Sequence, residues 1–227
     1  MKEALTYDDV LLVPQYSEIK SRKEVDLNCI LDDNLILNLP IISSPMDTVT
    51  ESEMAYTMDN LGGLGIIHRY NSIEEQAGLV AEVIGAGAKN VGAAIGVSDD
   101  YFERAQTLVE NGVNVICVDV AHGHHILMKD ALGVLKKSLG DAVHIMAGNV
   151  ATLQGINDLA EWGADSIRCN IGGGSICSTR IQTGHGLPGL QTIFDCAKTE
   201  HDVAIIADGG IRTAGDIVKA LVAGADF

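Results

Sequence analysis

The chain alternates short apolar runs with segments of helical periodicity. Each apolar run is rich in β-branched residues and ends in a Gly-, Ser- or Asp-rich turn, a pattern typical of a strand followed by a loop and a helix. The runs that predict strands are 40–43, 63–68, 91–95, 113–118, 143–147, 166–169 and 203–207. The segments that predict helices are 51–60, 72–86, 100–111, 125–138, 152–162, 189–199 and 213–223. We therefore expect about seven βα units after an extended opening that contains Pro14.

The strand candidates are apolar throughout, which predicts a parallel sheet covered by helices. Seven units, with the start of an eighth at Ala225-Asp226-Phe227, favour an α/β fold of the (β/α)₈ TIM-barrel type over a doubly wound sheet. The eighth strand is missing from this pattern, so we expect a C-terminally incomplete barrel with unpaired strand edges. Residues 1–227 are expected to form a single catalytic domain, and the stretch 68–91 is too short to hold an inserted regulatory domain.

Composition narrows the classes of partner. The 227 residues are 47% hydrophobic and carry a net charge of −16, which opposes binding to nucleic acid. No apolar run is long enough for a membrane span, and the N-terminus does not read as a secretory signal, so we expect no membrane partner and a cytoplasmic location. A phosphorylated ligand would have to be held locally, by backbone N–H groups and a helix N-terminus.

Five cysteines, without a CxxC pair, indicate free thiols in a reducing compartment and argue against structural zinc. His122, His124 and His125 lack the carboxylate or cysteine that would complete a metal-ligand set, so we do not expect them to bind metal.

The segment 170–180, NIGGGSICSTR, is the most informative part of the chain. Its three consecutive glycines allow close backbone approach to an anion or a cation, although a flexible loop explains such a run equally well when it is taken alone. Cys177, beside Thr179 and Arg180 after a strand end, is positioned for thiolate chemistry. Asp119 and Asp208 also follow strands, where each carboxylate could accept hydrogen bonds from a ribose or simply cap a helix.

Six motifs, spread over essentially the whole chain, resemble the IMP dehydrogenase/GMP reductase family. They are YDDVLLVPQ near the start, SSPMDTVTE at 43–51, GGLGIIH at 62–68, GNVAT at 148–152, GGGSICSTR and ADGGIR at 207–212. The resemblance implies a TIM barrel, commonly a homotetramer, in which a cysteine attacks C2 of a purine nucleotide and a nicotinamide cofactor exchanges hydride with that carbon.

The resemblance also implies roles for individual residues. Cys177 matches the nucleophile and Thr179 the hydroxyl beside it, whereas Asp119 matches a contact to the nicotinamide riboside of NAD or, alternatively, NADP. In a dehydrogenase, the carbonyls of Gly172, Gly174 and Cys177 would form part of a potassium site. The positions that match contacts to the nucleotide are Ser44, Met46, Asn149, Arg168, Ser175, Asp208, Gly209 and Gly210.

Two reactions share this chemistry. An IMP dehydrogenase converts IMP, NAD⁺ and water to XMP and NADH, and a GMP reductase converts GMP and NADPH to IMP and ammonia. SSPMDTVTE and GGLGIIH look like a dehydrogenase, which we favour narrowly, whereas DVAHGHH and SRKEVDL look closer to a reductase. A flavin-dependent barrel oxidoreductase and an inactive or assembly-only fragment are also compatible with the sequence, because a fold by itself does not fix a function.

Overall fold

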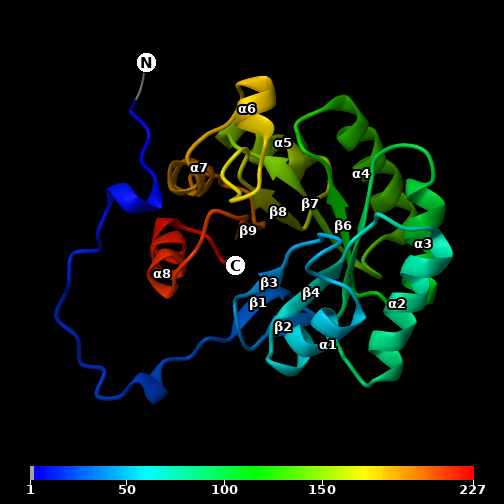
Figure 1. The fold of residues 1–227 in the computed structure, drawn as a ribbon, viewed down its shortest axis with the longest axis horizontal. Helices are drawn as coiled ribbons and strands as arrows, with labels where there is room; N and C mark the ends of the chain where they lie inside the picture. The colour runs from blue at the N-terminus through cyan, green and yellow to red at the C-terminus, as the bar shows by residue number, and fades with distance from the viewer. Residues whose placement is uncertain (1–2) are drawn as a thin grey trace.

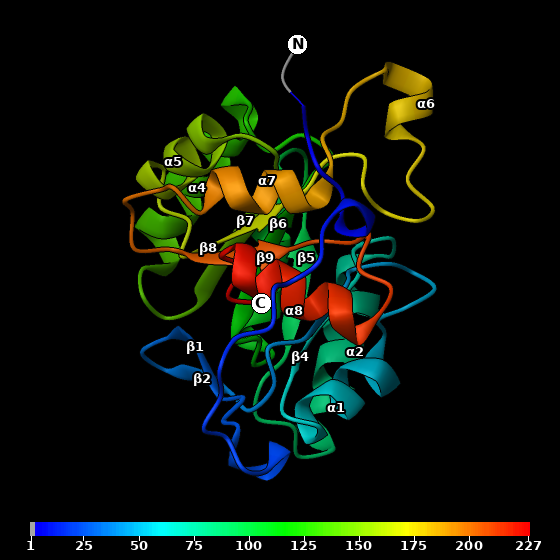
Figure 2. The ribbon, with the colours of Figure 1, turned by 90° about the vertical axis from the view of Figure 1, so that its left-hand side faces the viewer.

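Strands that are neighbours in the sequence are also neighbours in the main sheet. The computed structural model describes residues 3–227, and its seven-stranded parallel sheet has the order β3-β4-β5-β6-β7-β8-β9. Figures 1 and 2 show the sheet curled into an open barrel with helices on its outer side. The strands are β3 (Ile42–Ser43), β4 (Leu64–Ile67), β5 (Gly92–Ile95), β6 (Val115–Asp119), β7 (His144–Val150), β8 (Ser166–Cys169) and β9 (Ala204–Ala207). The predicted TIM-barrel class is confirmed.

A helix follows every strand of this sheet, close to the predicted ranges. Ser72 and Thr213 begin two of the helices with reciprocal capping boxes, which satisfy otherwise free N–H groups. The helices are α1 (Ser52–Asn60), α2 (Ile73–Gly85), α3 (Tyr101–Glu110), α4 (Ile126–Leu139), α5 (Leu153–Glu161), α7 (Gly189–Cys196) and α8 (Ala214–Ala223). The short α6 (Thr179–Thr183), which the sequence pattern did not predict, lies in the loop between β8 and α7.

The sheet separates two apolar clusters. The larger cluster fills the space between strands and helices, with Ile116, Ile145 and Ile167 among its fully buried members. The smaller cluster lies inside the barrel and includes Met146 and Phe227. Because both faces of the strands are buried, the strands read as continuous apolar runs in the sequence.

A two-stranded antiparallel hairpin, absent from the sequence prediction, packs against the inner cluster. It consists of β1 (Cys29–Asp32) and β2 (Leu35–Leu37), and its buried leucines join that cluster. On β1, Asp32 Oδ2 lies 2.6 Å from Nδ1 of the buried His144, which begins β7. The hairpin therefore covers the N-terminal end of the barrel, opposite the end where the strands finish.

The expected start of an eighth strand is present at residues 225–227. The Phe227 carbonyl accepts a hydrogen bond from Ala207 N at 2.8 Å, and Phe227 N donates to Ile205 O at 3.3 Å. These bonds follow the pattern of a parallel ladder beside β9. A cavity of about 310 Å³ lies between this end of the sheet and β3, and its lining includes Ile42 and Phe227.

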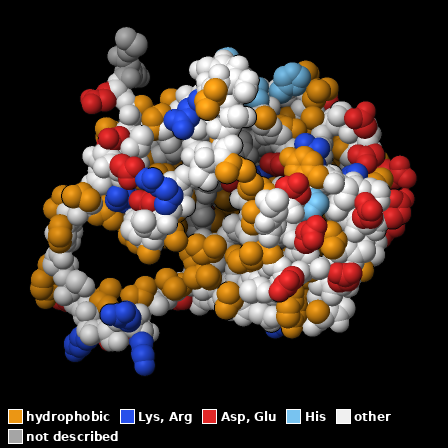
Figure 3. Space-filling model, in the orientation of Figure 1, with side chains coloured by type: hydrophobic (Ala, Val, Ile, Leu, Met, Phe, Trp, Pro, Cys, Tyr) orange, Lys and Arg blue, Asp and Glu red, His pale blue; other side chains and the backbone are white. Residues whose placement is uncertain are grey.

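The N-terminal segment forms an arm that is anchored at both ends. A short 3₁₀ turn, Tyr7–Asp9, packs beside α8, where Lys219 Nζ donates to Tyr7 O at 2.7 Å. Beyond it the chain is extended except for a second 3₁₀ turn, Arg22–Glu24. Figure 3 shows apolar side chains exposed along this arm, and Leu11 is 86% exposed. Within residues 3–227, no helix has the length and apolar character needed to cross a membrane.

Candidate active site

The residues singled out from the sequence gather around one cleft at the C-terminal ends of the strands. This is the end at which TIM barrels hold their active sites. The cleft has a volume of about 600 Å³, within the range of small-molecule sites. Every predicted site residue except Thr179 lines it, and Thr179 contacts Cys177. The predicted lining residues are Ser44, Met46, Asp119, Asn149, Arg168, Gly172, Gly174, Ser175, Cys177, Asp208, Gly209 and Gly210.

Cys177 lies half-buried in the loop between β8 and α6. Its Sγ is 3.3 Å from Oγ1 of Thr179, and its amide donates to the Gly174 carbonyl at 3.1 Å. Hydrogen bonds from the side chain and then the backbone of Thr179 lower the pKa of the Cys177 thiol, and the charge of Arg180 adds a smaller effect in the same direction. Because the thiolate is the nucleophilic form of cysteine, this environment activates Cys177 for covalent chemistry.

The other cysteines have different environments. Burial raises the pKa of Cys117 to about 12 and that of Cys29 to about 11. A hydrogen bond with Cys196 and burial raise the pKa of Cys169 well above the usual range, and Cys196 itself is fully buried. The lowered pKa of Cys177 sets it apart from Cys29, Cys117 and Cys169, whose pKa values are raised.

A buried guanidinium joins two carboxylates across the floor of the cleft. Arg168 Nη1 lies 2.5 Å from Asp119 Oδ1, and Nη2 lies 3.0 Å from Asp208 Oδ2. Burial acts to lower the pKa of Arg168, but the charges of Asp208 and Asp119 outweigh burial and raise it, so the guanidinium is cationic. Asn149 Nδ2 also donates to Asp208 Oδ2. The ends of β6, β7, β8 and β9 are thus joined by one polar network.

Two glycine-rich loops approach each other closely at the edge of the cleft. A Cβ on Gly210 would lie 2.7 Å from the Gly173 carbonyl oxygen, and φ at Gly210 is +75°, a conformation that favours glycine. Asn170 Nδ2 donates to the Asp208 and Gly209 carbonyls at 2.6 and 3.3 Å, which holds the two loops together. Glycines at these positions leave backbone N–H groups accessible to an anion.

The histidines after β6 have local partners. His124 Nε2 lies 2.6 Å from Asp158 Oδ2, and His125 Nδ1 accepts a hydrogen bond from Leu127 N at the start of α4. Among the residues that the structure describes, no group of three or more His, Cys, Asp or Glu side chains could hold a metal ion.

Asn170 and Tyr70 are among the residues of the cleft that the sequence analysis did not name as site residues. Asn170 is 4% exposed and its Oδ1 has no hydrogen-bond partner. Its place directly after a strand and before three glycines is a signal that could have identified it. Tyr70 lines the cleft from the loop after β4. Nothing in the pattern around Tyr70 distinguishes it from an ordinary surface tyrosine.

Comparisons with known proteins show which family this chain resembles. The model of the IMP dehydrogenase/GMP reductase domain matches residues 4–227. An inosine-5'-monophosphate dehydrogenase from Cryptosporidium parvum is 40% identical over 98% of this chain and 66% of its own length. The solved inosine 5' monophosphate dehydrogenase of Legionella pneumophila has a TM-score of 0.92 and 46% identity, with 99% of this chain and 68% of that chain covered. The solved GMP reductase C318A of Trypanosoma brucei has a TM-score of 0.95 and 29% identity, with 100% and 80% covered. This chain therefore spans between 66% and 80% of the length of these three relatives.

Proposed function

This chain belongs to the IMP dehydrogenase/GMP reductase family, and we propose that within it the chain acts as an IMP dehydrogenase. The reaction converts IMP, NAD⁺ and water to XMP, NADH and a proton. Greater identity to the Legionella dehydrogenase, 46%, than to the Trypanosoma reductase, 29%, supports this direction. The observation that carries the proposal is the activated thiol of Cys177 on a cleft shared with Asp119, Arg168 and Asp208.

Cys177 supplies the nucleophile. Its thiolate adds to C2 of IMP and forms an S–C2 bond, which converts a poor electrophile into a tetrahedral adduct that can lose hydride. When bound, the nicotinamide accepts that hydride. Water then attacks C2 of the resulting thioimidate, the S–C2 bond breaks, and Cys177 returns as a thiolate while a proton is released. The Thr179 hydroxyl, 3.3 Å from Sγ, stabilises the thiolate at the start and end of this sequence.

The glycine-rich loops hold the nucleotide in this proposal. Ser175, Gly209 and Gly210 offer hydroxyl and backbone N–H groups to its phosphate. Asp208 accepts hydrogen bonds from the ribose. A strongly acidic chain can bind an anion here because Arg168 neutralises part of the charge of Asp119 and Asp208. Four further residues are proposed to contact the nucleotide. Ser44 contacts its phosphate and ribose, whereas Met46, Asn149 and Arg168 lie near its base.

Asp119 is the proposed contact to the nicotinamide riboside. Its carboxylate is 20% exposed and lines the cleft, so its free lone pairs can accept from ribose hydroxyls. We assign NAD as the cofactor, with NADP as the alternative.

A potassium ion is proposed only for the dehydrogenase case. The carbonyls of Gly172, Gly174 and Cys177 belong to one tight loop, which suits a ring of oxygen ligands. The Gly174 carbonyl accepts the Cys177 amide with one lone pair, which leaves the other for an ion. A bound ion would order the loop that carries Cys177.

GMP reductase is the second candidate, and the TM-score of 0.95 with the Trypanosoma reductase favours it. In this direction Cys177 would displace ammonia from C2 of GMP, and hydride supplied to that carbon by bound NADPH would give IMP and free thiolate. Initial rates with IMP plus NAD⁺ and with GMP plus NADPH, followed by the absorbance of the reduced nicotinamide, separate the two. The faster reaction identifies the activity.

Alkylation of Cys177 tests the site independently of turnover. We expect IMP to slow labelling of Cys177, detected by peptide mass, while labelling of the half-exposed Cys29 stays unchanged. Cys177→Ala should abolish turnover, and Cys29→Ala should not. Full turnover by Cys177→Ala would refute covalent catalysis. Neither protection nor turnover in the wild-type chain would instead favour an assembly-only role.

We further propose that residues 1–227 act as one catalytic domain in the cytoplasm and assemble as a homotetramer. The five free cysteines support a reducing compartment. Sedimentation velocity of the 227-residue chain measures its mass, and a purely monomeric species would refute the tetramer.

A further inference from the structure

The wall of the cleft formed by the loop after β4 has no assigned role in the proposed reaction. Tyr70 belongs to this loop and lines the cleft together with Asp119. Its ring is stacked on His68 with centroids 6.1 Å apart, and the Arg69 guanidinium lies 5.6 Å from its centroid. Tyr70 is nevertheless 64% exposed. A large aromatic side chain that is backed by the protein and open to a ligand cleft is suited to pack against a planar ring.

Arg69 ties the same loop to the neighbouring strand. Its Nη2 donates to the Asp119 carbonyl at 3.3 Å, while its Nε is buried without any hydrogen-bond partner. The Oδ1 of Asn71 is also buried without a partner. Two of the three such side-chain atoms in the described chain therefore lie within residues 69–71. Leaving buried polar groups unpaired costs free energy. The conformation of this loop is therefore not explained by stability alone, which indicates a functional role.

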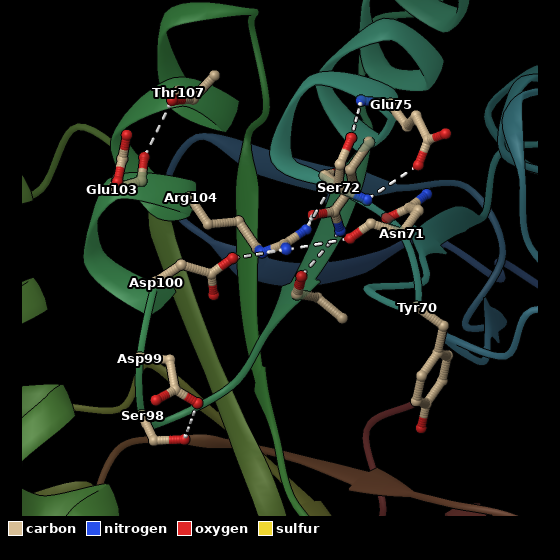
Figure 4. A network of polar contacts seen from close by, with 12 residues as sticks. Tyr70, Asn71, Ser72, Glu75, Ser98, Asp99, Asp100, Glu103, Arg104 and Thr107 are labelled. Carbon is tan, nitrogen blue, oxygen red and sulfur yellow. Dashed lines mark hydrogen bonds and ion pairs between the residues drawn. The ribbon is translucent and has the colours of Figure 1, made fainter.

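A buried arginine on the outer layer fixes the position of this loop. Arg104, on α3, donates from Nη2 to the Asn71 carbonyl at 3.1 Å and to Asp100 Oδ2 at 2.7 Å. Its Nη1 donates to the Ser72 carbonyl at 3.4 Å and to Gln76 Oε1 at 2.8 Å. Figure 4 shows Arg104 reaching from α3 to the Asn71–Ser72 backbone, with Tyr70 turned away from this cluster.

The cluster continues to the ends of two strands. Gln76 is fully buried, and its Nε2 donates to the carbonyls of His68 and Ala94 at 2.9 and 2.8 Å. Arg104 and Gln76 thus hold the loop after β4 against the end of β5 without lining the cleft themselves.

We propose that Tyr70, backed by His68 and Arg69, forms the wall against which the nicotinamide ring packs, and that Arg104 is a positioning residue that holds this wall. The proposal rests on the proposed function, because it assigns a new contact to the same cleft. The nicotinamide ring is chosen because Arg69, the neighbour of Tyr70, contacts Asp119, which is the proposed contact to the nicotinamide riboside.

The test compares Michaelis constants for NAD⁺ and for IMP in the 227-residue chain. Tyr70→Ala should raise KM for NAD⁺ roughly tenfold, the size expected for one lost ring stack, and leave KM for IMP unchanged. Tyr70→Phe, which retains the ring, should stay close to wild type. Tyr16→Ala is the matched control because Tyr16 is 88% exposed on the N-terminal arm. An unchanged KM for NAD⁺ in Tyr70→Ala would refute the proposal that the nicotinamide ring packs against Tyr70.

Arg104→Lys tests the positioning role, since a lysine cannot reproduce the planar fork of donors. It should raise KM for NAD⁺ severalfold in the wild-type background and have no further effect in the Tyr70→Ala background, because both changes act through one contact. Equal effects in both backgrounds would overturn the role. If Arg104→Lys is unstable, Asp100→Asn removes a partly exposed partner of Arg104 and should give the same pattern at smaller size.

The outcomes separate this proposal from the proposed function. If the wild-type chain neither turns over IMP nor protects Cys177, the proposed function has failed. If the wild-type chain does both and Tyr70→Ala behaves like wild type, only the proposed packing of the nicotinamide ring against Tyr70 is refuted.

Discussion

Arg168 and Asp208 form an ion pair across two neighbouring strands, with Nη2 and Oδ2 3.0 Å apart at the floor of the cleft. The same guanidinium also contacts Asp119, so one buried cation separates two carboxylates that the proposed reaction assigns to different ligands. Without it, two negative charges would face each other where an anionic nucleotide has to bind.

Arg168→Met should therefore destabilise the fold by about 3–5 kcal/mol, because it leaves the carboxylates of Asp119 and Asp208 partly buried and uncompensated. Denaturant unfolding measures the change, with Arg22→Met on the exposed arm as the control. Adding Asp119→Asn to Arg168→Met should restore part of the loss. No recovery in the double variant would show that the charge of Asp119 is not the cause.

The pKa of Cys177 should depend on Thr179. Hydrogen bonds from Thr179 lower the pKa of the thiol, so Thr179→Val should shift the pH profile of Cys177 alkylation to higher pH. At neutral pH the alkylation rate should fall because less thiolate is present. Ser178→Ala is the matched control, since the Ser178 side chain makes no capping hydrogen bond at the start of α6. A profile unchanged by Thr179→Val would contradict the assignment.

Gly210→Ala should weaken nucleotide binding and cost about 1–3 kcal/mol in stability, because its Cβ would lie 2.7 Å from the Gly173 carbonyl and φ is +75°. The loops must separate to accommodate the methyl group. Gly215→Ala is the control, because Gly215 lies in α8 with only Thr213 Oγ1 nearby, at 3.6 Å. Protection of Cys177 by IMP reports binding in both variants, and equal protection would contradict the close packing of the loops.

The burial of His144 at the start of β7 predicts a pH dependence of stability. Burial lowers the pKa of His144 from its ordinary value of 6.5, against the opposing effects of Asp32 and Asp165, while Lys136 acts in the same direction as burial. The folded state favours the neutral imidazole of His144. The stability that this side chain contributes is therefore fully present above pH 6.5 and is lost as pH falls through the lowered pKa. As pH falls below 6.5, the free energy of unfolding should therefore decrease faster in the wild type than in His144→Phe. The difference in slope should be at most about 1.4 kcal/mol per pH unit.

His185→Phe is the control for this experiment, because His185 is exposed in the loop after α6. The His185→Phe variant should keep the wild-type slope. Identical slopes for wild type and His144→Phe would remove His144 as the source of the pH dependence.

The sequence predicted the main sheet well because most of its strands, such as β4, β5 and β8, are buried on both faces. Runs such as 113–118 can then be recognised from their apolar character alone, and the structure places β6 at Val115–Asp119. The hairpin β1–β2 was missed although two apolar runs flank Asp33 and Asn34, a recognisable turn signal. Its short strands gain their stability from leucines packed into the barrel, a contact that has no local signature.

Some features of the candidate site could also be predicted from the sequence, because they depend on neighbouring residues. Cys177 could be identified from sequence, because a cysteine after a glycine-rich loop at a strand end differs from one within an apolar run. The lowered pKa of Cys177 depends mainly on Thr179, only two residues away, so that feature is also local.

By itself, the sequence determined the repeating βα units, the family resemblance and the choice of Cys177 as the candidate nucleophile, because each depends on residues close together along the chain. Only the tertiary structure decided that Arg168 lies between Asp119 and Asp208, and that Arg104 holds the loop of Tyr70 from the outer layer. These contacts join residues that are about 30 to 50 positions apart in the sequence. Strand order and register decide which of these distant polar groups become partners.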